Sequence, residues 1–118
     1  MQTHKDLDVW KLGIDLVVDV YSFCDLLPTA ERYGLVSQMQ RSAVSIPSNI
    51  AEGSARRSKN ELIQFLHIAL GSLAELETQI IIVQEIKMVA SNDYVLQKIE
   101  VLRKKLLNYR RYVKENYV

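Results

Sequence analysis

The sequence contains few of the residues that form tight turns, cross-links or membrane spans. Its 118 residues include only four glycines and two prolines, which disfavours a fold with many turns and favours long helices. Its single cysteine, Cys24, excludes an intramolecular disulfide and suits a reducing compartment. The longest uninterrupted apolar run, Ile80–Val83, is far shorter than the roughly 20 residues that span a bilayer. We therefore expect a cytoplasmic protein.

The net charge is small, but charged residues of the two signs are unevenly distributed along the chain. The formal net charge is +1, so the whole molecule is not strongly biased toward nucleic acid. Residues 1–30 carry two lysines against five aspartates, whereas residues 98–118 carry seven lysines and arginines against two glutamates. One end of the chain is therefore acidic and the other basic.

Apolar residues recur at three- or four-residue steps in four segments. This spacing predicts helices over about residues 6–27, 31–52, 59–89 and 93–116. Ser58 and Glu61 predict a capping box at the start of the third helix, and residues 90–93 predict a turn with a new N-cap. Three short connections between long helices favour an all-α, up-down antiparallel four-helix bundle, with residues 1–118 forming a single domain.

The first predicted helix is apolar on two sides. One stripe consists of Leu7, Trp10, Ile14, Val17, Tyr21 and Cys24. The other consists of Val9, Leu12, Leu16, Val20, Phe23 and Leu27. A helix in a small monomeric bundle needs one apolar face, so we predict that the second stripe is a subunit interface of a homo-oligomer. The alternative is a helix placed deep within a monomer.

The second predicted helix contains a proline and ends near a glycine. Pro47 cannot donate a backbone hydrogen bond, so we expect the helix to bend or to break and restart there. Gly53 suits a left-handed residue at the helix end. Beside Pro47 we predict a buried polar network, with a ligand or partner site and a solvated face as alternatives. Its members would be Arg41, Ser45, Asn49 and Glu52, together with Glu75 and Glu77 of the third helix.

Residue patterns typical of enzymes are absent from the sequence. Neither histidine follows a glutamate by three residues, because Gln64 precedes His67 and Met1 precedes His4, so the usual di-metal motif of helix bundles is missing. Gly53 and Gly71 do not form a phosphate-binding loop. We expect no catalytic residues, no metal and no cofactor.

The chain resembles the four helix bundle protein family, also called the 23S rRNA intervening-sequence protein family, over about Leu7 to Glu115. The most specific segments are "LDVWK" (Leu7–Lys11), "YGLVSQMQRSAVSIPSNIAEGSAR" (Tyr33–Arg56), "SKNELIQFLHIALGS" (Ser58–Ser72) and "ELETQ" (Glu75–Gln79). Gly13 departs from the small helix-former usual in the family and is expected to loosen the first helix slightly. The resemblance implies an antiparallel bundle that assembles as a homopentameric ring. A related group, the accessory proteins of diversity-generating retroelements, suggests nucleic-acid binding by analogy.

Basic residues form the candidate nucleic-acid contact, and tyrosines 109, 112 and 117 lie among them. The candidates are Arg56, Arg57, Lys59, Arg103, Lys104, Lys105, Arg110, Arg111 and Lys114. One hypothesis is a non-enzymatic assembly that binds RNA or DNA through phosphate contacts. The other is an oligomeric scaffold for a protein partner, in which the basic fourth helix pairs with the acidic first helix and no basic surface remains.

Overall fold

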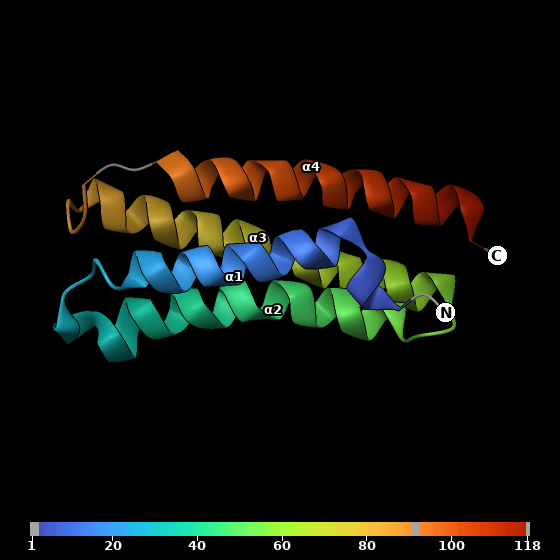
Figure 1. Ribbon diagram of the computed structural model, residues 1–118, viewed down its shortest axis with the longest axis horizontal. Helices are drawn as coiled ribbons and strands as arrows, with labels where there is room; N and C mark the ends of the chain where they lie inside the picture. The colour runs from blue at the N-terminus through green and yellow to red at the C-terminus, as the bar shows by residue number, and fades with distance from the viewer. Residues whose placement is uncertain (1–2, 91–92, 118) are drawn as a thin grey trace.

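The computed structural model describes residues 3–90 and 93–117, and over these residues the protein is all-α, with four long helices and no strand. The helices are α1 (Asp8–Cys24), α2 (Ser37–Ser54), α3 (Lys59–Glu85) and α4 (Asp93–Asn116). They lie side by side along the long axis of a body of 48 × 22 × 21 Å (Figure 1). Because α2 packs on α1 and α3, and α4 packs on α3 and α1, the four helices enclose one core.

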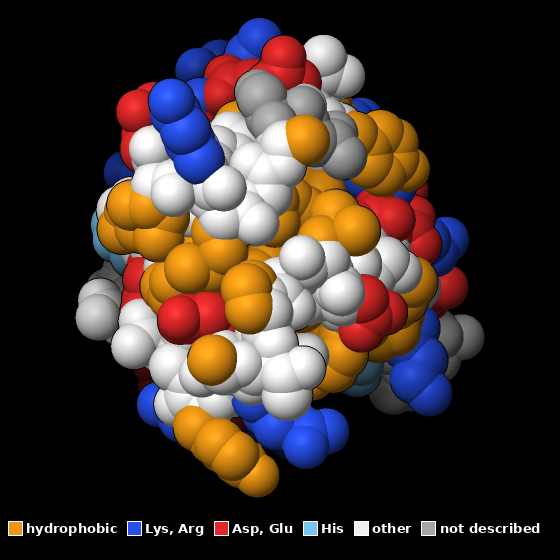
Figure 2. Space-filling model, turned by 90° about the vertical axis from the view of Figure 1, so that its left-hand side faces the viewer, with side chains coloured by type: hydrophobic (Ala, Val, Ile, Leu, Met, Phe, Trp, Pro, Cys, Tyr) orange, Lys and Arg blue, Asp and Glu red, His pale blue; other side chains and the backbone are white. Residues whose placement is uncertain are grey.

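The connections divide the molecule into two different ends. The start of α1, the α2–α3 connection and the end of α4 lie together at the right of Figure 1, and the other two connections lie at the left. The left end carries hydrophobic side chains across its centre and charged side chains around its rim (Figure 2). Leu26, Tyr33 and Ile86 are among the exposed apolar residues of these left-hand connections.

Local interruptions shorten three helices relative to the predicted ranges. Between α1 and α2 the chain forms two short helical segments, η2 (Thr29–Glu31) and η3 (Arg32–Val36). Gly34 has non-helical dihedral angles (φ −110°, ψ −105°), so α2 begins only at Ser37. The predicted N-cap in the α3–α4 turn falls on residues 91–92, outside the described residues.

The C-terminal end of α3 has the hydrogen bonds of a Schellman motif. The Met88 amide donates to the Val83 carbonyl and the Lys87 amide donates to the Gln84 carbonyl, both at 3.0 Å. Lys87 takes the left-handed conformation (φ 59°) that this motif requires and that glycine usually supplies. The helix therefore ends at Glu85, before the predicted limit at residue 89.

The structure excludes one of the two alternatives predicted at Pro47, a break in α2, and the prediction that Gly53 ends the helix is wrong. The helix is continuous from Ser37 to Ser54 with buried Pro47 inside it, so it does not break and restart there. Gly53 lies within the helix and has no positive φ. A Cβ at Gly53 would lie 2.7 Å from Cβ of Phe65, so this glycine allows α2 and α3 to approach. Gly13 does the same for α1 and α2, because a Cβ there would lie 3.3 Å from Cβ of Pro47.

The predicted subunit interface on α1 is also wrong, because that stripe faces the protomer's own core. Val9, Leu16, Val20, Phe23 and Leu27 are buried, and Leu12 packs against them. They meet apolar residues of the other three helices, including seven residues of α3 that are buried in this core. By length and composition α3 alone among the described helices is apolar enough to cross a membrane, which is common for the core helix of a bundle.

The outward apolar side of α1 is instead part of the other stripe. Ile14 and Tyr21 are exposed and Trp10 and Val17 are partly buried. Trp10, Ile14 and Val17, together with residues of α2, border a shallow hollow of about 300 Å³, which we call the α1–α2 groove. Its lining consists of Trp10, Ile14, Val17, Val44, Pro47, Ser48 and Ala51.

Candidate functional site

The candidate basic residues come from two parts of the chain that meet at one end of the bundle. The α2–α3 connection carries Arg56 and Arg57, and Lys59 begins α3. The Lys59 ammonium donates to the Lys114 carbonyl near the end of α4 at 3.4 Å. Ser58 accepts from the Glu61 amide at 3.3 Å and so sets the start of α3 beside that contact. The fold thus joins two basic segments that are about 55 residues apart.

A second contact between α3 and α4 adds a titratable group that the sequence had not placed. The Arg110 guanidinium lies 3.2 Å from Nε2 of His67, one nitrogen of an exposed imidazole. Arg56 lies over the Phe65 ring at 5.2 Å and its Nε lies 3.9 Å from the Glu61 carboxylate. The packing of α3 on α4 brings His67 to Arg110, 43 residues later in the chain.

The candidate basic residues of α4 form no ion pair with acidic residues of α1 within the described part of the chain. Over residues 3–90 and 93–117, three of the nine candidate cations form ion pairs within 4 Å, and each pair is local in sequence. Arg103 and Lys104 both contact Glu100 of their own helix, and Arg56 contacts Glu61. The one α1–α4 ion pair in this part of the chain joins Asp19 to Lys98, which was not among the candidates. The Lys98 ammonium donates to the Asp19 carboxylate, and this bond, with a further one that it donates to the Tyr94 hydroxyl, raises the pKa of Lys98.

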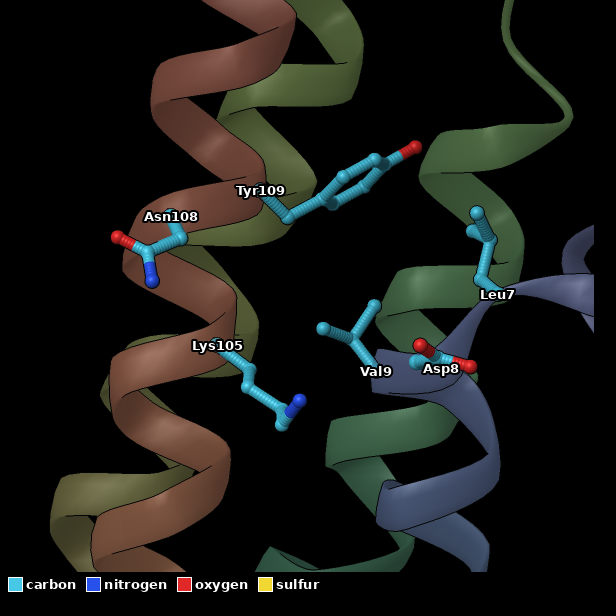
Figure 3. Close-up of a pocket in the computed structure, with 6 residues that line it drawn as sticks. All are labelled: Leu7, Asp8, Val9, Lys105, Asn108 and Tyr109. Atoms are coloured by element: carbon cyan, nitrogen blue, oxygen red, sulfur yellow. The ribbon is translucent and has the colours of Figure 1, made fainter.

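A hollow of about 320 Å³ separates the start of α1 from α4 (Figure 3). Lys105 and Val9 point into the gap, Asp8 lies at its α1 edge, and Asn108 points away from it (Figure 3). The Tyr109 ring reaches from α4 toward Leu7. The hollow therefore combines an apolar floor, one cation and one carboxylate, and it is open to solvent.

Three tyrosines form a cluster beside this hollow, at the end of α4. The rings of Tyr109 and Tyr112 are nearly parallel (14°) with centroids 6.4 Å apart, and Tyr117 meets Tyr112 edge-on at the same distance. The Tyr109 and Tyr117 hydroxyls lie 3.5 Å apart. Partial burial raises the pKa of Tyr109, and its contact with Tyr117 raises it further, so this phenol stays protonated. We call these residues the tyrosine cluster.

The predicted polar network forms only in part. Asn49 donates to the Ser45 carbonyl at 2.7 Å and to the Ser45 hydroxyl at 2.9 Å, and that hydroxyl lies 2.8 Å from the Ser72 hydroxyl of α3. Ser72 had not been predicted as a member. Arg41 is exposed and, within the part of the chain described, forms no ion pair with Glu75 or Glu77.

The remaining predicted members lie outside this Ser45–Asn49–Ser72 contact. Glu52 is exposed at the surface of α2. The Glu75 carboxylate accepts a hydrogen bond from the side-chain amide of Gln79 at 3.3 Å. Gln79 is buried, and its Oε1 atom has no hydrogen-bond partner. The network is therefore a small hydroxyl–amide contact that aligns α2 with α3 near Pro47. Within the described residues, no three His, Cys, Asp or Glu side chains lie close enough together to hold a metal ion.

Comparison with known proteins places the chain in a family. A search of curated proteins finds no match. The family described as 23S rRNA-intervening sequence protein matches residues 5–108, which includes all of α1, α2 and α3 and most of α4. This match covers the two helices that form the α1–α2 groove and all the candidate basic residues except Arg110, Arg111 and Lys114. The chain belongs to the 23S rRNA-intervening sequence protein family.

Proposed function

We propose that this protein is a non-enzymatic cytoplasmic bundle, up-down antiparallel in topology, that assembles with copies of itself and binds RNA through its basic end. The positions of the connections in Figure 1 support the topology. The family description supports a role connected with RNA. A non-enzymatic role is supported by the form of the hollow beside α4 and of the α1–α2 groove, which are both shallow and open to solvent.

One observation carries the RNA proposal: the packing of α3 on α4 joins two basic segments, and acidic α1 does not neutralise them. Lys59 reaches the end of α4, and Arg110 lies beside His67. Arg111 and Lys114 are exposed within the same two turns. Phosphate binding depends on such unpaired cations, because each one that neutralises a phosphate releases counterions.

Self-assembly is supported by the α1–α2 groove. Its lining is almost wholly apolar, and exposed Val18 and Tyr21 extend the apolar surface along α1. A contiguous exposed apolar strip on a small protein is typical of an interaction surface. The resemblance to the family supports a ring of five, in which every basic end would be repeated and weak contacts would add.

Light scattering tests the assembly directly. We expect a particle with the mass of five 13.6-kDa chains for the wild type, and a smaller one for Ile14→Glu, which places a charge in the groove. Asp15→Glu, at the next exposed position of α1, is the matched control and should leave the mass unchanged. A monomeric wild type at micromolar concentration would refute the ring.

RNA binding is tested by titrating labelled RNA and duplex DNA at several salt concentrations. We compare wild type with Arg110→Glu/Arg111→Glu and with Arg32→Glu/Arg41→Glu, which makes the same charge change away from the basic end. If two phosphate contacts are lost, the slope of log K against the logarithm of the salt concentration should become shallower by about 1.4 for single-stranded RNA. Only the first variant should show this effect.

Other outcomes would identify other functions. Equal weakening by both variants would indicate non-specific attraction and contradict a basic-end site. Tighter binding of DNA than of RNA would replace RNA as the ligand. Intact rings that bind neither nucleic acid at low salt would favour a scaffold for a protein partner, a function that the apolar α1–α2 groove also suits.

A further inference from the structure

The tyrosine cluster exposes aromatic surface that the fold holds in place. Tyr112 is 55% exposed and Tyr117 is 42% exposed, whereas Tyr109 is partly buried against the core. The contacts among the three rings restrict their orientation. A pre-ordered ring loses less conformational entropy when a planar ligand stacks on it. The cluster is therefore suited to bind a flat π-system.

Charged groups on both sides of the cluster determine where an anionic ligand would lie. Arg111 precedes Tyr112 and is exposed, and Lys105, seven residues before Tyr112 and therefore on the same side of α4, points into the adjoining hollow. Asp8 lies at the opposite edge of that hollow and would repel a phosphate. A sugar-phosphate chain would thus follow α4 and stay away from α1, with its bases turned toward the rings.

We propose that the tyrosine cluster is a base-stacking platform for single-stranded RNA, with Lys105 and Arg111 as phosphate contacts. This proposal rests on the proposed function and specifies its ligand. In a duplex the base faces are stacked on one another, whereas in a single strand they are free to stack on aromatic side chains. From Lys105 to Tyr112 the helix rises about 10 Å at 1.5 Å per residue, enough for a short run of nucleotides.

The platform is tested with three labelled probes at one fixed salt concentration. The probes are a single-stranded oligoribonucleotide, the same RNA as a duplex, and a chain of abasic ribose-phosphates of equal length. The protein variants are Tyr112→Leu and Tyr117→Leu, which keep apolar side chains but remove the ring. Tyr33→Leu is the matched control, because Tyr33 is 89% exposed and lies in the α1–α2 connection at the opposite end.

We expect Tyr112→Leu to weaken binding of the single strand by roughly 5- to 100-fold, the range found when one stacking ring is removed. The abasic chain should bind wild type and Tyr112→Leu equally, and Tyr33→Leu should behave as wild type. Circular dichroism and light scattering check that each variant keeps its helices and its assembly size. The duplex should bind more weakly than the single strand.

Three results distinguish failure of the platform alone from failure of the proposed function. If wild type binds RNA with a steep salt dependence but Tyr112→Leu and Tyr117→Leu bind the single strand as tightly, the platform is refuted and RNA binding remains. If wild type prefers the duplex, the platform is likewise refuted. If wild type binds none of the probes at low salt, both proposals are refuted.

Discussion

Gly53 lies where α2 packs tightly against α3, and adding a single methyl group there tests the packing of the bundle. In Gly53→Ala the new Cβ would lie 2.7 Å from Cβ of Phe65 and 3.2 Å from Cδ1 of Leu62. Carbon atoms in contact prefer about 3.5–4.0 Å. The Leu62 methyl can rotate away, but Cβ of Phe65 is bonded directly to the α3 backbone. Relief therefore requires the two helices to separate.

The magnitude follows from two opposing effects. Alanine favours a helix interior over glycine by about 1 kcal/mol. Overpacking of a core costs about 1–3 kcal/mol, and the upper end applies here because a backbone-linked atom must move. We therefore expect Gly53→Ala to lower the free energy of unfolding by about 2 kcal/mol. For a chain of this size that corresponds to a decrease in Tm of roughly 8 °C.

The assay is urea and thermal unfolding followed by far-UV circular dichroism, at one fixed protein concentration because the assembly contributes to stability. Gly71→Ala is the matched control: Gly71 is in mid-α3, and a Cβ there would meet nothing within 4 Å. Gly71→Ala should raise the free energy of unfolding by about 1 kcal/mol. In Gly13→Ala the new Cβ would lie 3.3 Å from Cβ of Pro47, so the stability of this variant should lie between those of Gly53→Ala and Gly71→Ala.

The order of the three glycine variants decides the outcome. If Gly53→Ala were as stable as Gly71→Ala, α2 and α3 could not approach as closely as the structure shows. An unchanged slope of unfolding free energy against urea would show that all variants unfold to the same extent.

Three further predictions concern other residues. Lys87→Gly should stabilise the protein by about 1 kcal/mol because it relieves a left-handed φ, and Lys87→Ala should give no such gain in the same unfolding assay. Burial raises the pKa of the Cys24 thiol to about 11, and the nearby Asp25 carboxylate contributes to this increase. At pH 8 the thiol should therefore react with a disulfide reagent roughly 100-fold more slowly than in the urea-unfolded protein. Equal reaction rates in the two states would contradict the burial of Cys24. Asn49→Ala should cost about 1–2 kcal/mol through its lost hydrogen bonds, whereas Arg41→Met should change stability by less than about 0.5 kcal/mol, and the reverse order in unfolding would favour the predicted network.

The number and approximate placement of the helices were accessible from the sequence, because apolar spacing and capping are local properties. Ser58 accepts from the Glu61 amide as the pattern predicted, although the Glu61 carboxylate lies near Arg56. The ends of α2 and α3 were less accessible. An irregular Gly34 delays the start of α2, and a left-handed Lys87 follows the end of α3. Neither residue interrupts the apolar period.

The candidate site shows the same division. The basic residues of α4 and of the α2–α3 connection were visible as a charge asymmetry, but their meeting at one end depends on how α3 packs on α4. The contacts of Lys59 with the end of α4, and of Arg110 with His67, are tertiary. The stacked rings of Tyr109 and Tyr112 lie three residues apart, so their proximity was predictable, whereas the hollow beside them also requires α1.

By itself the sequence determined that four amphipathic helices form, that the first is apolar on two sides, and that one end of the chain is basic. Only the tertiary structure decided which side of α1 faces inward. Both stripes have the same helical period, so periodicity does not determine the rotation of the helix about its axis. That rotation follows from fitting α1 against its neighbours, where Gly13 lets it approach Pro47 and directs Val9, Leu16 and Val20 into the core.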